Sequence, residues 1–390
     1  MRIVKWILGI ALTVLVVGLL GFFIFAPGIA ERDMNVVVEH DPYPVTAEGA
    51  AFHDTLLIGD WHADTLLWKR DPLERSDRGH VDIPRLIEGN VTLQVFTAVT
   101  QSPSGQNYEE NSAETFDNIT LLAVGQLWPP RTWNSLLERA LYQAERLRDA
   151  ANRSGGHLRL IRTEKDLDAV LALRDAGEEV VGGVLGIEGA HPLEGEIANL
   201  DRLEAAGYRL IGLHHFFDNE LGGSLHGVGD AGLTDFGRQV VKEVAARGMI
   251  LDLAHSSPQV ARDVMEMTDM PLVVSHTGIR SHCDTKRNYP DDLMQAIAAT
   301  GGVIGIGYWE DVTCDDSPLG VARTIQAAID LVGEDHVALG SDYDGTVTTG
   351  FDTAELAALT QAMLDIGLTE AQIRKVAGGN MVRVLRDRLN

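Results

Sequence analysis

Cysteine and basic residues are scarce in this sequence of 390 residues. Two cysteines are too few for a disulfide-dense scaffold, and the 40 glycines follow no period, which excludes a collagen-like chain. The 32 Lys and Arg face 57 Asp and Glu, so the formal net charge is −25. Such a surface repels phosphate backbones, which argues against nucleic-acid binding. With 45% hydrophobic and 23% charged residues, the chain is expected to fold as an enzyme or a small-ligand binder.

An apolar stretch from Trp6 to Ala26 carries no charged residue. It is about 21 residues long, enough for one helix across a hydrocarbon core of about 30 Å. Two basic residues precede it, so the positive-inside rule places the N-terminus in the cytoplasm and the remainder of the chain outside. Residues 1–30 are therefore expected to anchor a periplasmic domain in the inner membrane. A cleaved signal peptide stays an alternative, because Gly28 and Ala30 supply small residues for cleavage, and the domain would then be secreted to the periplasm.

Beyond this segment the sequence divides into a short lead-in and one large unit. Residues 31–52 predict a linker, because two prolines break regular structure there. Residues 53–390 predict a single domain. They include an insertion at 101–156, whose second half is helical in pattern from Trp133 to Ala151.

Short apolar runs alternate with helical stretches throughout residues 53–390. Helix starts are indicated by Thr234, by Ser257 before Pro258, by Pro290, and by a capping box of Thr369 with Gln372. Eight continuous apolar runs predict a parallel sheet closed into a (β/α)8 barrel of the TIM type, with a doubly wound open sheet as the alternative. The runs are Thr55–Gly59, Val91–Val99, Glu179–Ile187, Arg209–Leu213, Met249–Leu253, Pro271–Val274, Gly302–Ile306 and His336–Leu339.

Side chains able to bind a metal follow these runs. The carboxyl ends of barrel strands meet at one mouth, so residues distant in sequence are expected to come together there. Imidazole nitrogen and carboxylate oxygen together suit a borderline metal such as Zn²⁺. The residues are His62 and Asp64 after the first run, Glu188 after the third, His214 and His215 after the fourth, His255 after the fifth, His276 after the sixth and Asp342 after the eighth.

This set is larger than one tetrahedral metal site requires, so two ions are expected. Glu188 can bridge them with its two carboxylate oxygens. The ions would lower the pKa of a shared water and form a bridging hydroxide near neutrality, with Asp342 exchanging the proton. Such a hydroxide suits the hydrolysis of an amide or ester carbonyl. The two ligand sets would be His62, Asp64 and Glu188, and Glu188, His255 and His276.

Seven short motifs occur along the chain in a fixed order. They are Asp60-Trp-His62-Ala-Asp64, Gly186-Ile-Glu188-Gly189, Leu213-His-His215, Asp252-Leu-Ala-His255, Ser275-His276, Arg287-Asn-Tyr-Pro-Asp-Asp292 and Gly340-Ser-Asp342-Tyr-Asp-Gly345. In this order the sequence resembles the membrane (renal) dipeptidase family, peptidase family M19, and in particular its bacterial exported branch. The resemblance extends from about residue 55 to residue 385.

The resemblance implies a metal-dependent hydrolase barrel that cleaves the peptide bond of dipeptides, including those with a C-terminal D-residue. It implies two Zn²⁺ per chain bridged by Glu188. His215 would polarise the substrate carbonyl, Arg287 would bind the free carboxylate of the dipeptide, and Asp342 would shuttle the proton. It also implies a disulfide between Cys283 and Cys314. The implied zinc ligands are His62, Asp64, Glu188, His255 and His276.

Two other interpretations stay open. One is a related amide hydrolase that matures an envelope or metabolite peptide, and the other is a catalytically silent binding module attached to the membrane. The complete set of metal-binding residues argues against the second. The expected partners are small peptides and the membrane, through the N-terminal helix. The oligomeric state is open, with a homodimer as one alternative.

Overall fold

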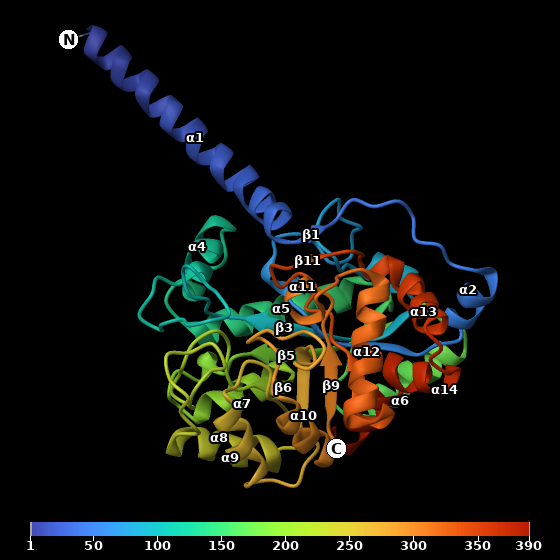
Figure 1. Cartoon of the computed structure of the whole chain (residues 1–390). Coiled ribbons are helices and arrows are strands. Elements are labelled where there is room, and N and C mark those ends of the chain that lie inside the picture. The colour runs from blue at the N-terminus through green and yellow to red at the C-terminus, as the bar shows by residue number, and fades with distance from the viewer. Residues whose placement is uncertain (1, 390) are drawn as a thin grey trace.

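A closed barrel of parallel strands forms the body of the molecule (Figure 1). The structure is a computed structural model, and it describes residues 2–389. Each strand of the barrel pairs with the next in the order β2, β3, β5, β6, β7, β8, β9, β10, and β10 pairs back to β2. The predicted (β/α)8 barrel is thus confirmed. Its strands are β2 (Ile58–Ala63), β3 (Val91–Val99), β5 (Val181–Glu188), β6 (Tyr208–Gly212), β7 (Ile250–Asp252), β8 (Val273–Thr277), β9 (Val303–Ile306) and β10 (Val337–Leu339).

All eight predicted runs overlap one of these strands, and the first differs most. The observed strand, β2, begins at Ile58, whereas the predicted run begins at Thr55. Strand β2 also continues to Ala63, so His62 lies within the strand. Three shorter strands were not predicted. Strand β4 (Leu158–Leu160) pairs with the beginning of β5, and β1 (Val36–Val37) pairs with β11 (Thr348–Thr349).

The strands read as continuous apolar runs because both of their faces are covered. Every residue of β2, β3 and β5 is buried, which is typical of a parallel sheet enclosed by helices. The helices around the barrel are α3 (Ile83–Glu88), α5 (Leu136–Arg153), α6 (Glu164–Asp175), α7 (Ala198–Ala206), α8 (Asp235–Ala246), α9 (Pro258–Met265), α10 (Asp291–Ala299), α12 (Pro318–Val332), α13 (Leu356–Asp365), α14 (Glu370–Arg374) and α15 (Asn380–Arg388).

The helix starts expected from sequence are present. The side chains of Thr234 and Ser257 accept hydrogen bonds from the backbone at the beginning of α8 and α9, and Pro290 precedes α10. Thr369 and Gln372 form a capping box at α14. The C-terminal helix is nevertheless divided, because a π-helical turn, η6 (Lys375–Gly379), separates α14 from α15.

Short helical segments occupy the connections at both ends of the barrel. They are α2 (Ala47–His53), α4 (Asn118–Gly125) and α11 (Glu310–Thr313), together with the 3-10 turns η1 (Thr65–Leu67), η2 (Pro130–Thr132), η3 (His191–Leu193), η4 (Glu334–His336) and η5 (Thr353–Glu355). Helices α4 and α5 lie in the segment 101–156; the part with α4 projects from the barrel beside the N-terminal helix in Figure 1, whereas α5 packs against the barrel.

Helix α1 (Arg2–Met34) extends away from the barrel (Figure 1) and is long and apolar enough to cross a membrane. Its last turn is packed against the body of the molecule. Glu31 is 1% exposed and accepts hydrogen bonds from Arg70 Nε at 2.6 Å and from Arg78 Nε at 2.7 Å. Residues 31–52, expected as a linker, contain the end of α1, strand β1 and most of α2.

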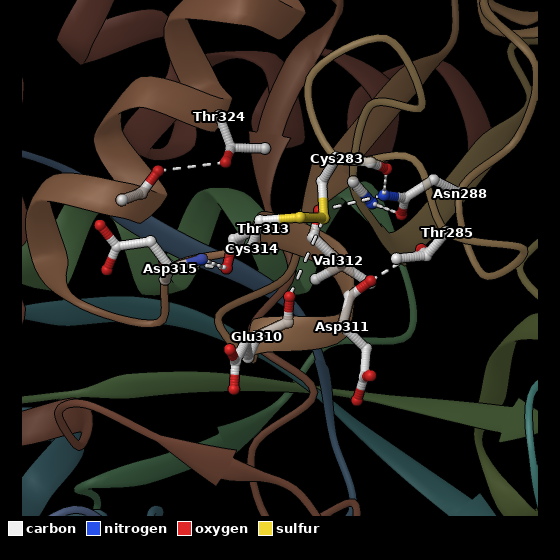
Figure 2. Close-up of a disulfide and its surroundings, with 12 residues drawn as sticks. Cys283, Thr285, Asn288, Glu310, Asp311, Val312, Thr313, Cys314, Asp315 and Thr324 are labelled. Atoms are coloured by element: carbon white, nitrogen blue, oxygen red, sulfur yellow. Dashed lines mark hydrogen bonds between the residues drawn. A yellow bond between two sulfur atoms is a disulfide. The ribbon is translucent and has the colours of Figure 1, made fainter.

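Cys283 and Cys314 form a disulfide, with their Cα atoms 5.6 Å apart. Figure 2 shows the bond joining the loop after β8 to the residue that follows α11. Thr285 and Asn288 add hydrogen bonds from the same loop to the backbone of α11. The disulfide implied by the family resemblance is therefore confirmed.

Candidate active site

The metal-capable residues meet at the carboxyl ends of the strands, as the barrel requires. His62 and His276 lie within β2 and β8, and Glu188 is the last residue of β5. The remaining members lie one to three residues after the ends of β2, β6, β7 and β10. All are buried, and they are Asp64, His214, His215, His255 and Asp342.

Glu188 lies at the centre of this cluster. Its Oε1 atom is 3.1 Å from the Nε2 atom of His255, 3.4 Å from that of His276 and 3.5 Å from that of His62. Its Oε2 atom is 3.3 Å from the Nε2 atom of His215. One carboxylate thus faces four imidazole rings, as a ligand shared by two cations would.

Two further carboxylates border the cluster on the side of His62. The Nε2 atom of His62 is 3.6 Å from Asp64 Oδ1 and 3.8 Å from Asp342 Oδ1. The ligand atoms of His62, Asp64 and Glu188 lie within 4.8 Å of one another, and the same holds for His62, His276 and Asp342. The first of these sets is one of the two expected from sequence; Glu188 and His255 of the second expected set group with His215. Beside the same Oε1 atom of Glu188, the Nε2 atoms of His255 and His276 are 2.9 Å apart.

His214 does not join the cluster. Its Nδ1 atom lies 3.1 Å from the hydroxyl of Ser256, and burial lowers its pKa to about 3. The adjacent His215 does join it, so only one of the two successive histidines faces Glu188.

The charges of the cluster favour a bound cation. Burial alone lowers the pKa of His62, but Glu188 and Asp64 outweigh burial and raise it to about 10. Burial and the charge of Asp64 raise the pKa of Glu188 well above its ordinary value. Burial, with the positive charge of Arg287, lowers the pKa of His255 well below its ordinary value, so this imidazole is neutral, the form that binds metals. Bound cations would take the place of the proton at His62.

A hydroxyl group fixes the tautomers of two histidines. Ser275 Oγ donates to Asp252 Oδ2 at 2.6 Å, so it accepts from the Nδ1 atoms of His276 at 2.8 Å and His62 at 3.3 Å. Both rings would then offer the Nε2 atom to a bound cation, which at His62 would replace the proton. The Nε2 atom of His62 is buried and forms no hydrogen bond within residues 2–389. This donor set fits Zn²⁺, which binds imidazole nitrogen and carboxylate oxygen.

Two site residues have a backbone conformation that is rare for side chains other than glycine. His255 has a φ of 62° and Asp342 has a φ of 60°. Such left-handed residues cost conformational energy and are found at functional sites, where surrounding structure holds them. Both follow the end of a strand, where this turn of the backbone directs the side chain into the mouth of the barrel.

Arg287 lies in the loop after β8 and is 1% exposed. Its Nη2 atom donates to the backbone carbonyl of His276 at 2.7 Å, and its guanidinium lies 5.5 Å from the ring of Trp309. Its Nε atom is buried and unpaired among the described residues. An N–H donor therefore remains available for a ligand.

A cavity of about 800 Å³ contains these groups. Asp64, Glu188, His215, His255, Arg287 and Asp342 line it. Sequence reasoning missed other residues that line or support it, among them Tyr108, whose hydroxyl accepts from Trp309 Nε1 at 2.9 Å. Tyr108 follows no strand and belongs to the irregular part of the segment 101–156, so no pattern identified it. Ser275 stands in one of the seven motifs, directly before His276, but its role in orienting two histidines was not expected.

A parallel barrel with histidines and carboxylates gathered at the carboxyl ends of its strands defines a metal-dependent hydrolase barrel. The profile of the membrane dipeptidase family, peptidase family M19, matches residues 48–389, and the chain belongs to this family. The family resemblance inferred from the motifs is confirmed.

Individual relatives agree with this assignment. A dipeptidase from Aspergillus oryzae, aclJ, is 35% identical over 53% of this chain, and the match spans about half (51%) of that relative's length. Among solved structures, a metallo peptidase of family M19, dipeptidase AC, matches with a TM-score of 0.71 at 26% identity. The match covers 86% of this chain and 99% of the chain of dipeptidase AC. A metallo peptidase from Rhodobacter sphaeroides, with a phosphinate mimic of the dipeptide L-Ala-D-Ala, has a TM-score of 0.68 at 25% identity, over 86% and 100% of the two chains.

Proposed function

We propose that this protein is a zinc-dependent dipeptidase that hydrolyses the peptide bond of free dipeptides, including those with a C-terminal D-residue. The observation that carries the proposal is the position of Glu188, whose two oxygens face four imidazole rings at 3.1 to 3.5 Å. The Rhodobacter sphaeroides relative with its L-Ala-D-Ala mimic supports a dipeptide as the class of substrate.

Two Zn²⁺ ions would be held by five residues, with Glu188 shared between them. When bound, they would supply a water of lowered pKa as the nucleophile and polarise the substrate carbonyl. His62 and Asp64 would hold one ion together with Glu188. His255 and His276 would hold the other ion, again together with Glu188.

Asp342 would take the proton of the attacking water and return it to the leaving amine. Burial raises the pKa of its carboxyl to about 7; nearby His62 opposes this rise, and Asp64 adds to it. A pKa near the working pH suits a group that both accepts and donates a proton. Its Oδ1 atom is 3.8 Å from His62 Nε2, within the same cluster as the proposed ligands.

His215 would stabilise the negative charge that develops on the substrate oxygen. Its Nδ1 atom is 3.2 Å from the carbonyl oxygen of Gln101, which orients the ring. Burial lowers the pKa of His215 to about 4, so the ring is neutral before reaction. A negative charge forming next to its Nε2 atom raises that pKa and favours the imidazolium, which can donate to the oxygen.

Arg287 would bind the terminal carboxylate of the dipeptide. The guanidinium is planar and permanently charged, which suits a carboxylate, and its unpaired Nε atom is available for this contact. A residue that recognises a free carboxylate limits cleavage to the last peptide bond of a short substrate.

We also propose that α1 anchors the protein in the inner membrane, with the barrel in the periplasm. The length and composition of α1 support this location, and the disulfide is consistent with an oxidising compartment.

Amine release from a panel of dipeptides tests the proposed activity. The panel contains L,L and L,D pairs and a C-terminally amidated control, each with zinc-loaded and chelator-treated protein. We expect zinc-dependent cleavage of the free dipeptides only. Cleavage of none of them by protein carrying two zinc ions would overturn the dipeptidase proposal in favour of a maturation enzyme or a binding module.

A further inference from the structure

Helix α4 and the turn after it present an apolar surface that no described part of the chain covers. The side chains of Phe116, Leu121 and Leu127 are 56%, 62% and 58% exposed. Trp133 adds a further large apolar side chain that is exposed. Outside α1, half of the exposed large hydrophobic side chains of residues 2–389 lie within 116–133.

This segment is also free of charge. Residues 118–130 contain no Asp, Glu, Lys or Arg, although charged residues make up 23% of the chain. An exposed, uncharged group of apolar side chains indicates a surface that meets another apolar phase or protein.

The position of α4 beside α1 indicates what this apolar surface contacts. Helix α4 contacts α1, and Leu121, Leu122 and Gly125 line the same cavity as Phe22 and Ala26 of α1. Phe22 and Ala26 belong to the last turn of the apolar stretch Trp6–Ala26. A helix rises about 1.5 Å per residue, so this turn extends about 6 Å inward from the end of the apolar stretch.

A basic residue lies at the same level. The Nζ atom of Lys69 is 3.4 Å from the backbone carbonyl oxygen of Phe23 in α1, and the Lys69 side chain is exposed. A lysine at the edge of an apolar span is typical of the headgroup region, where its charge contacts lipid phosphates.

We infer that the apolar surface of α4 is buried in the outer interface of the bilayer that holds α1, and that the active-site cavity opens toward that membrane. Interfacial segments bury their apolar side by about 5–10 Å, which agrees with the level of Phe22 and Ala26. The occupant is the lipid bilayer, because the surface continues the membrane-spanning part of α1. This inference rests on the anchoring proposed above.

The orientation of the cavity follows from its walls. Glu188 and Arg287 line the same cavity as Leu121 of α4 and Phe22 of α1. Peptides would therefore reach the proposed zinc site along the membrane surface, between the bilayer and the mouth of the barrel.

The test uses the full chain with an environment-sensitive fluorophore on a single introduced cysteine. Leu121→Cys places the probe on α4. Glu178→Cys is the matched control, because Glu178 is exposed and precedes β5, at the end of the barrel opposite the mouth. Both native cysteines are in the disulfide and do not react with the probe under non-reducing conditions. Circular dichroism checks that both variants fold, and Leu127→Cys repeats the measurement at a second exposed position.

In vesicles of phosphatidylethanolamine and phosphatidylglycerol, we expect the probe at position 121 to shift to shorter wavelength. It should lose most of its emission to doxyl-labelled lipid, whereas the probe at position 178 should keep its emission in water. An unquenched probe at position 121, in protein whose α1 resists carbonate extraction, would overturn the inference and leave the anchor intact.

Two other outcomes are distinguishable. An intact mass showing that the cellular protein lacks α1 would overturn the anchoring and this inference together. A wavelength shift in detergent micelles that grows with protein concentration would assign the α4 surface to a second copy of the chain and overturn the membrane contact.

Discussion

At the scale of single residues, Ser275 connects the two halves of the proposed zinc site. Its hydroxyl accepts from the Nδ1 atoms of both His62 and His276, whose rings lie 3.9 Å apart beside the same oxygen of Glu188, and donates to Asp252. Asp252 in turn accepts from the backbone N–H of Ala254 and Ser275, which fixes its position. One hydroxyl therefore fixes the tautomer of one residue in each of the two proposed ligand sets.

Replacing that hydroxyl is expected to weaken zinc binding without unfolding the barrel. For Ser275→Ala we expect an affinity about 10–100-fold lower, because groups that orient metal ligands contribute on this scale. Competition with a chromophoric chelator measures the affinity without reference to activity. Ser281→Ala, at an exposed serine of the next loop, is the control. Equal affinities in wild type and Ser275→Ala would show that the histidines are oriented by other contacts.

Arg287 is expected to act on the substrate carboxylate. Arg287→Ala should raise KM about 10–100-fold for free dipeptides, because a hydrogen bond to a charged group contributes about 1.5–3 kcal/mol. C-terminally amidated substrates should change little. Because Arg287 also donates to the His276 carbonyl, zinc content is measured in the same variant. An equal rise of KM for both substrates at full zinc content would contradict the carboxylate contact.

The sequence predicted the metal-capable residues of the site better than the residues that hydrogen-bond to them or line the cavity beside them. A metal-capable residue directly after an apolar strand is recognisable because the barrel brings all strand ends together, and Glu188 and His255 were found in this way. Tyr108 was not, since a residue in an irregular connection has no periodicity that fixes its position. Contacts such as Ser275 with Asp252 depend on side-chain conformations, which spacing alone does not determine.

At the scale of elements, the strands and helix starts were largely predictable from sequence. Continuous apolar runs identified all eight barrel strands, and residues such as Thr234 and Ser257 marked helix starts through their side-chain chemistry. Strands β1 and β11 have two residues each, too few to form a pattern, and β4 is not an apolar run, because its middle residue, Arg159, is exposed. The π-helical turn between α14 and α15 has no sequence signal of this kind.

The disulfide is expected to stabilise the elements that it joins. It closes a loop of 31 residues, for which the chain-entropy model gives about 3–4 kcal/mol of unfolding free energy. Urea unfolding with and without reductant measures this difference, and alkylation should detect two additional thiols after reduction. The double variant Cys283→Ser, Cys314→Ser should not respond to reductant. Two reactive thiols in the native protein would contradict the bond.

At the scale of the whole molecule, the proposed ligands connect distant parts of the barrel. They come from the ends of β2, β5, β7 and β8, so bound ions would cross-link strands on different sides of the mouth. Metal binding to the folded chain alone stabilises it by mass action.

Chelation is therefore expected to lower the unfolding temperature. At zinc concentrations about 1,000-fold above Kd, one site adds about 4 kcal/mol, which corresponds to a shift of roughly 5–10 °C for a domain of this size. Differential scanning calorimetry of zinc-loaded and chelated protein measures the shift. Glu188→Ala should bind less zinc and lose at least about 100-fold in activity. Its unfolding temperature should change much less on chelation, whereas Glu178→Ala should behave as wild type. Full activity of Glu188→Ala at normal zinc content would exclude a bridging role.

The folded junction between α1 and the barrel determines how far the enzyme can reach. If residues 31–52 were a flexible linker, its mean end-to-end distance would be roughly 25 Å, and the barrel could move by about that distance from its point of attachment. Here Glu31, paired with Arg70 and Arg78, joins the helix to the barrel as one body. With α1 in a bilayer, the active site would stay at a constant distance from the membrane surface. Lateral diffusion of the protein would then carry the active site only through a thin layer of solvent next to the membrane. Peptides released elsewhere in the compartment would be cleaved only after they enter that layer.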